Sequence, residues 1–87
     1  YRFVSNSHKK IDGRFADTLL YLSEKIYESP CFPLQLTHRE LADLVGVSRE
    51  NLTRVLLKFR KDMIIEVSRE RLEILNWELL RTISKNG

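Results

Sequence analysis

The chain is poor in the residues that build disulfide-bonded, zinc-binding and membrane-spanning proteins. Of its 87 residues, one is cysteine, three are glycine and two are proline. Cys31 has no partner for an internal disulfide, which suits a reducing cytoplasm, and we interpret it as a packing residue. The two histidines lack ligand spacing, so we expect no metal site. No apolar run approaches the roughly 18 residues of a membrane span, and no signal peptide is recognisable.

Sequence motifs for catalysis are also missing. The chain has no glycine-rich phosphate loop, no nucleophile motif and no pair of catalytic carboxylates. We therefore expect neither an enzyme nor a cofactor in this fragment. Apolar residues make up 43% of the chain and charged residues 31%, which is typical of one small globular domain. Because the chain starts with Tyr1 and not with methionine, we expect it to be a piece of a longer protein.

Positive charge is concentrated in the middle of the chain. The net charge is +3, and residues 37–61 carry six Lys or Arg against three Asp or Glu. Residues 1–36 carry five against four, and residues 62–87 carry four against five. A basic excess on one element is what phosphate binding requires, although charge alone would favour a merely solvated surface.

The first regular element that the sequence predicts is a helix over residues 12–28. Apolar residues recur there at helical spacing, and Pro30 disfavours helix at the residue before it. The predicted buried stripe consists of Ile11, Phe15, Leu19, Leu22 and Ile26.

Two short helices with a tight turn between them follow. Thr37 caps the first helix, and Glu40 completes a capping box three residues later. Gly46 ends that helix at a position that favours left-handed backbone, and Ser48 caps the next helix. The turn is therefore short, and the two helices must meet at a sharp angle. The predicted inward-facing residues are Leu41, Leu44, Val45, Leu52, Val55, Leu56 and Phe59.

The remaining segments are extended or helical. Residues 32–36 contain a proline and predict an edge strand or a connector. Residues 63–68 and 72–75 predict a β-hairpin around a charged turn, residues 69–71. Asn76 then caps a last helix, which we expect to end near Ser84.

This order of elements predicts an α+β fold, mostly α, of the winged helix-turn-helix kind. The domain spans residues 11–87, with the helix-turn-helix over 37–61 and the wing over 63–75. Residues 1–10 show no clear period, and we interpret them as a linker or the end of an upstream dimerisation or hinge segment.

Two stretches of sequence carry a resemblance to a known family. Residues 13–22 (GRFADTLLYL) and residues 36–56, which close with Ser48-Arg49-Glu50 and Thr53-Arg54, resemble the C-terminal DNA-binding domain of the catabolite activator and fumarate–nitrate regulator family. With the hairpin, the resemblance covers roughly residues 11–75. Met63 stands where the family pattern has glycine, which predicts a different exit from the third helix.

The resemblance implies that the third helix reads bases through Arg49, Glu50, Thr53 and Arg54. Arginine can bind guanine O6 and N7, and glutamate can accept from cytosine N4. Members like the catabolite activator use Arg, Glu and Arg, whereas the fumarate–nitrate branch uses Glu, a hydroxyl residue and Arg. Both sets are present here, so TGTGA-like and TTGAT-like half-sites remain open. The competing interpretation is a solvated helix surface with an i,i+4 pair between Glu50 and Arg54.

Phosphate contacts should surround this face and fix its register on DNA. The candidates at the helix starts and on the wing are Thr37, His38, Ser48, Asn51, Arg69 and Arg71. An exposed histidine such as His38 is more often plain surface than a contact.

The sequence thus predicts the sequence-specific DNA-binding output domain of a bacterial, cytoplasmic, effector-controlled transcription regulator. The resemblance places a sensor domain and a dimerising helix upstream, so we expect a homodimer on a palindromic operator, weak DNA binding by this fragment and room for an RNA polymerase contact. The alternative is a winged helix that binds protein through Leu57 and the hairpin and does not read DNA.

Overall fold

A computed structural model describes residues 10–86 and confirms a mostly helical α+β winged helix-turn-helix. The predicted linker, residues 1–10, lies outside the described residues apart from Lys10. In chain order the elements are α1 (Ile11–Tyr21), the π-helical turn η1 (Leu22–Ile26), β1 (Cys31–Pro33), α2 (His38–Val45), α3 (Arg49–Lys61), β2 (Ile65–Ser68), β3 (Arg71–Ile74) and α4 (Trp77–Asn86).

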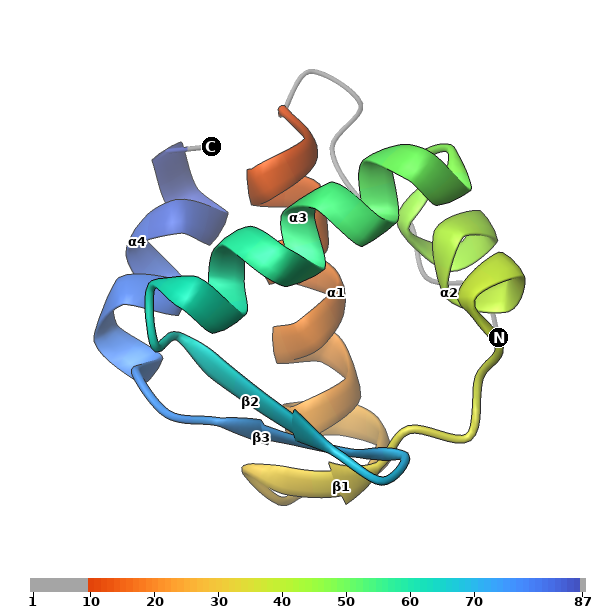
Figure 1. Cartoon of the computed structure of the whole chain (residues 1–87). Helices are drawn as coiled ribbons and strands as arrows, with labels where there is room; N and C mark the ends of the chain where they lie inside the picture. Colours follow the sequence, from red (N-terminus) through yellow and green to blue (C-terminus); the bar gives the residue numbers. More distant parts are fainter. Residues whose placement is uncertain (1–9, 87) are drawn as a thin grey trace.

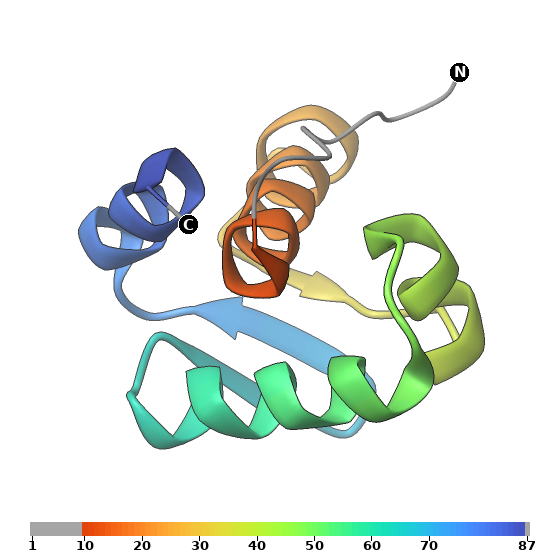
Figure 2. The same ribbon diagram turned by 90° about the horizontal axis from the view of Figure 1, so that it is seen from above.

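The helices gather on one face of a small sheet (Figure 1). The sheet has the strand order β1-β3-β2, and both strand pairs are antiparallel. Figure 2 shows α4 beside α1, with α3 running across the lower part of the view and α2 next to the N-terminal end of α3. The helix-turn-helix therefore lies along one side of the domain, where one face of α3 is left uncovered.

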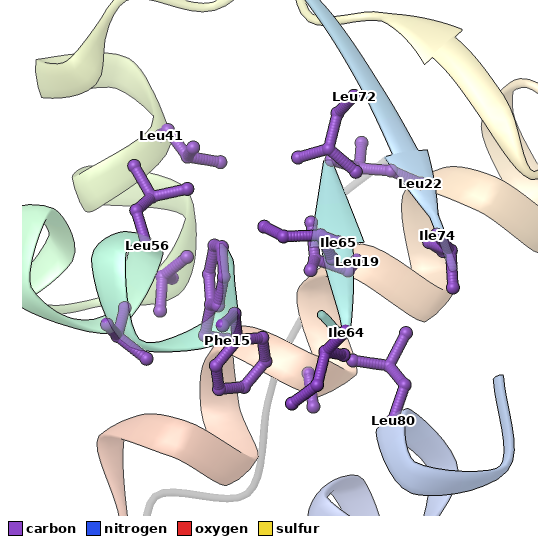
Figure 3. Close-up of a cluster of buried hydrophobic side chains, with 14 of the residues drawn as sticks. Phe15, Leu19, Leu22, Leu41, Leu56, Ile64, Ile65, Leu72, Ile74 and Leu80 are labelled. Carbon is purple, nitrogen blue, oxygen red and sulfur yellow. The ribbon is translucent and has the colours of Figure 1, made fainter. Parts of the chain in front are cut away.

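The core lies between the helices and the sheet and contains side chains from both (Figure 3). Phe15 of α1 and Phe59 of α3 are fully buried, and their rings meet edge to face at 5.1 Å between centroids. Leu72 on the central strand and Leu80 of α4 complete the buried centre. Burying each such side chain contributes about 1.5–3 kcal/mol. The predicted inward stripe of α3 is confirmed, because all four of its residues are buried.

The first helix differs from its prediction in its last turn. The α-helical hydrogen bonding stops at Tyr21, and within η1 the Tyr27 N–H donates to the Leu22 carbonyl, five residues back, at 2.9 Å. The wider turn changes the angular step between residues. As a result Ile26, which a regular helix would place on the buried stripe, is 52% exposed.

The caps around the turn of the helix-turn-helix are confirmed. The Glu40 N–H donates to Thr37 Oγ1 at 3.0 Å, and the Thr37 N–H donates to Glu40 Oε1 at 2.9 Å. Gly46 follows α2 with φ +84°, a conformation that costs a residue with Cβ about 1–2 kcal/mol. The Asn51 N–H donates to Ser48 Oγ at 3.1 Å and so caps α3.

The different exit from α3 that Met63 predicted is wrong, because Met63 adopts the backbone that glycine favours at this position. Met63 has φ +60°, its N–H donates to the Arg60 carbonyl, and the Ile64 N–H donates to the Phe59 carbonyl at 2.9 Å. These bonds form a Schellman motif, in which the left-handed position is usually glycine. Burial of Ile64 beside Phe59 supplies the apolar contact that accompanies the motif.

The wing forms as predicted, but its turn is tighter. Arg69 and Glu70 make a two-residue connection with φ +45° and +66°, which is the backbone that a tightly twisted hairpin requires. The prediction that Arg71 belongs to the turn is wrong, because Arg71 pairs with Ser68 as the first residue of β3.

Two further elements differ from the sequence prediction in where they begin or end. The strand expected over residues 32–36 begins at Cys31 and ends at Pro33, and it is an edge strand, paired with β3. Asn76 caps the last helix through a bond from the Leu79 N–H at 3.0 Å, but that helix continues beyond Ser84 to Asn86.

Candidate nucleic-acid interface

The outer face of α3 carries the four candidate base-reading residues. Arg49, Glu50, Thr53 and Arg54 are all exposed, whereas the opposite face of the same helix is buried. Helical geometry places these four residues within the first two turns after the Ser48 cap. The first half of α3 therefore presents cationic, anionic and hydroxyl groups on a surface that no other described element covers.

These four side chains form no ion pairs with one another. Within residues 10–86 no ion pair joins Glu50 to Arg54, so the solvated i,i+4 pair that competes with base reading is absent there. The hydroxyl of Thr53 donates to the Arg49 carbonyl at 3.0 Å, which leaves its oxygen as an acceptor. The guanidinium groups and the carboxylate keep their full hydrogen-bonding capacity for an external partner.

A shallow hollow connects this face to the start of α2. Its volume is about 300 Å³, and it is lined by His38 together with Arg49, Glu50 and Thr53. A neighbouring hollow of about 340 Å³ places Arg39 beside Ser48 and Arg49. The helix-turn-helix thus brings His38, a candidate phosphate contact, next to the candidate base readers, and adds Arg39, which sequence reasoning did not single out.

Another hollow lies on the flank of α3 that faces α1. Asn51 and Arg54 line a hollow of about 160 Å³ with Lys58 and with Asp12 of α1. Lys58 Nζ lies 2.5 Å from Asp12 Oδ2, and this hydrogen bond, with the carboxylate charge, raises the pKa of Lys58 above its ordinary value. Lys58 therefore adds a positive charge beside the exposed face of α3.

The two wing arginines occupy different places. Arg69 is exposed in the turn at the tip of the wing. Arg71 lies on the outer face of the sheet, where its Nη2 is 3.3 Å from the sulfur of half-buried Cys31. Arg69 thus matches the predicted position at the wing tip, whereas Arg71 is set back from it.

A contact across the fold holds the turn before α3, and sequence reasoning missed it. Arg14 Nη2 of α1 donates to the Gly46 carbonyl at 2.8 Å. A Cβ on Gly46 would overlap the same guanidinium nitrogen. The bonded residues are 32 positions apart, so no local sequence signal could have revealed the pair.

The part of the chain that the structure describes has neither a membrane-spanning helix nor a metal-binding cluster. No helix among residues 10–86 is long and apolar enough to cross a membrane. The same part of the chain holds no group of three or more His, Cys, Asp or Glu side chains that could bind a metal ion.

The fold and the exposed face of α3 define a winged helix-turn-helix domain of the DNA-binding class. The family model of the Crp-like helix-turn-helix domain matches residues 13–83. The chain therefore belongs to the Crp-like helix-turn-helix family of transcription regulators.

Solved structures agree with this assignment. A Crp/Fnr-family transcriptional regulator, described as putative, from Eubacterium rectale is 29% identical, with a TM-score of 0.81 over 92% of this chain and 36% of its own length. The catabolite activator protein of Thermus thermophilus is 32% identical, with a TM-score of 0.74 over 86% of this chain and 34% of its own.

A more distant likeness supports the fold alone. FixK2 of Bradyrhizobium japonicum has a TM-score of 0.81 at 18% identity, over 93% of this chain and 40% of that protein. No curated protein sequence matches the chain. The chain spans about a third of the length of the first two solved relatives.

Proposed function

We propose that this domain binds DNA sequence-specifically, with α3 in the major groove, as the output domain of an effector-controlled regulator. The observation that carries the proposal is the exposed set Arg49, Glu50, Thr53 and Arg54 on one face of a capped helix. The major groove is wide enough for a helix, and there each base pair presents a distinct pattern of donors and acceptors to side chains.

Glu50 is the residue that separates base reading from simple phosphate binding. A carboxylate is repelled by phosphate, but it can accept a hydrogen bond from the exocyclic amine of cytosine. Arg49 and Arg54 lie on either side of it along the helix and can each hold a guanine. Such a pattern of mixed charge favours a helix that reads bases over one that binds backbone alone.

The helix starts and the wing supply the phosphate contacts in this proposal. Thr37, His38, Ser48 and Asn51 lie at the N-termini of α2 and α3, where the helix dipole favours an anion. Arg69 and Arg71 of the wing would extend the contact along the backbone. A domain of this size covers little DNA, so dimerisation through residues beyond this chain would supply affinity on a palindromic operator.

The experiment selects bound duplexes from a random library with the 87-residue chain at low salt. We expect enrichment of one short half-site and a steep loss of affinity as salt rises. The base preferences of Arg49→Ala and Thr53→Ala then distinguish TGTGA-like from TTGAT-like half-sites. Only the variant that has lost a base contact should accept other bases at one position of the half-site.

Glu50→Ala is the sharpest single test. We expect it to weaken the preference at one base pair by about 5–150-fold, the equivalent of the roughly 1–3 kcal/mol that a good contact discriminates. Glu78→Ala, an exposed carboxylate in the first turn of α4, is the matched control and should leave the profile unchanged. Binding without sequence preference or salt dependence would favour the alternative, a winged helix that binds protein.

A further inference from the structure

A row of charged side chains on α3 continues beyond the base-reading residues. Glu50, Arg54 and Lys58 follow one another at intervals of four residues, so they lie along one line of the helix surface. Arg54 and Lys58 both line the hollow of about 160 Å³ between α3 and the start of α1. The side chain of Lys58 is 58% exposed, and it is not among the proposed DNA contacts. The row therefore ends in a cation to which no function is yet assigned.

Lys58 is held by an acidic side chain from another element. Its Nζ lies 2.5 Å from Oδ2 of Asp12, in the first turn of α1. Among the described residues that line the hollow, Asp12 alone is acidic. At this distance the two opposite charges largely cancel for any third group that approaches them. The pair therefore attracts an anion much more weakly than the ammonium group alone would.

The hollow lies on a side of α3 where DNA phosphates would come. A helix in the major groove has a phosphate backbone along each of its sides. Asn51, a proposed phosphate contact at the start of α3, lines this hollow together with Arg54, a proposed base reader. A DNA backbone within reach of Asn51 would thus also pass Asp12 and Lys58, where its phosphates would meet a carboxylate as well as an ammonium group.

We propose that Lys58 is a further phosphate-binding residue of the DNA interface, and that Asp12 limits its contribution by competing with the phosphate for the ammonium group. Phosphates carry no sequence information, so the pair sets the affinity for DNA of any sequence. The proposal rests on the part of the proposed function that places α3 against DNA, but it does not require base reading.

The probe is a short fluorescein-labelled DNA duplex of random sequence, titrated with the 87-residue chain by fluorescence anisotropy. Asp12→Asn should raise the affinity about tenfold at about 50 mM salt, because Lys58 can then neutralise one more phosphate. Each phosphate contact changes the slope of log affinity against log salt by about −0.9. The gain should therefore shrink about 3.5-fold, to about threefold, when the salt is raised to about 200 mM.

Two further variants identify the cation and exclude a simple effect of net charge. Asp12→Asn combined with Lys58→Met has the net charge of the unchanged chain, and its affinity should return to within about twofold, because the released cation is gone. Glu24→Gln is the matched control, since it also removes a carboxylate from an exposed ion pair and releases Arg81, 2.7 Å away. That pair joins η1 to α4, and neither residue lines the hollow, so the control should change the affinity by less than about twofold.

Three results would overturn the proposal. The first is an unchanged or lower affinity of Asp12→Asn, which is expected if the pair serves only the stability of the fold. The second is a gain that persists in the double variant, since Asp12 would then act only by repelling DNA. The third is an equal gain in Glu24→Gln, which would reflect net charge alone.

The two proposals can fail separately. Enrichment of a half-site in the library selection, without a gain from Asp12→Asn, would refute this inference alone. A gain on random duplexes without enrichment of any half-site would refute base reading and support the phosphate contact. If neither the unchanged chain nor Asp12→Asn binds DNA at low salt, both proposals are refuted.

Discussion

The contact between Arg14 and Gly46 predicts a specific non-additivity in a double-mutant cycle. Gly46→Ala places a Cβ where the Arg14 guanidinium lies and forces a side chain into left-handed backbone. Because the guanidinium is the far end of a flexible side chain, it can move away, but it then loses its bond to the Gly46 carbonyl. Gly46→Ala therefore removes the same bond that Arg14→Ala removes.

The expected free energies follow from these two terms. Left-handed backbone costs alanine about 1–2 kcal/mol, and the partly exposed Arg14 hydrogen bond contributes about 1 kcal/mol. Arg14→Ala should then destabilise the domain by about 1 kcal/mol and Gly46→Ala by about 2–3 kcal/mol. The double variant should lose only about 2–3 kcal/mol, which leaves a coupling of about 1 kcal/mol.

Urea unfolding of the four proteins measures this coupling, with the far-ultraviolet circular dichroism of the helices as the signal. Arg81→Ala, which removes the α4 arginine bonded to Glu24 at 2.7 Å, is the matched control and should add to Gly46→Ala without coupling. Additive losses for Arg14→Ala and Gly46→Ala would show that the guanidinium does not hold the turn in solution, and the reasoning would be refuted.

Two other perturbations test the wing and the flank of α3. Glu70 has φ +66°, so Glu70→Gly should raise the free energy of unfolding by about 0.5–1 kcal/mol, once the backbone entropy of glycine is subtracted. The urea midpoint should rise with it, and a lower midpoint would contradict this. The Asp12 carboxylate raises the pKa of Lys58 above its ordinary value of 10.5, so the pair stabilises the fold below that pH, and its contribution disappears as pH rises through the folded pKa. The difference in unfolding free energy between Asp12→Asn and the unchanged chain should therefore narrow from pH 9.5 to pH 11.5 (about one unit on each side of 10.5), and a constant difference would contradict it.

Local signals predicted the helix-turn-helix with the correct caps. The side chains of Thr37, Glu40 and Ser48 bond backbone N–H groups only three residues away. Gly46 ends α2 through its own left-handed backbone. Interactions of this range can be inferred from sequence because they need no knowledge of distant segments. The inward stripe of α3 was equally accessible, since helical period alone assigns its burial.

Features that depend on distant segments were not predictable. The π-helical turn at Leu22–Ile26 breaks the helical period without a proline or glycine inside it. β1 could only be placed by its pairing with β3, about 40 residues away (Phe32 pairs with Leu72). The tight wing turn uses Arg69 and Glu70 in backbone that usually demands asparagine or glycine, so the sequence lacks the expected mark.

The same distinction between local and distant interactions applies to the candidate site. Arg49, Glu50, Thr53 and Arg54 share a helix, so their common exposed face followed from spacing alone. The hollow that joins His38 to them depends on the angle between α2 and α3. Arg71 was expected at the wing tip because three residues were assigned to a turn that needs two.

The orientation of α3 is fixed at both ends by contacts that reach other elements. At its start, the Ser48 cap and the Arg14 bond to Gly46 hold the turn against α1. Near its end, Lys58 bonds to Asp12 and Phe59 packs on Phe15, again on α1. A reading face is selective only when its supporting contacts hold it within a fraction of an ångström. The first helix, which need not touch DNA, therefore determines how precisely the third one can present its side chains, and Arg14→Ala should lower specific binding more than non-specific binding.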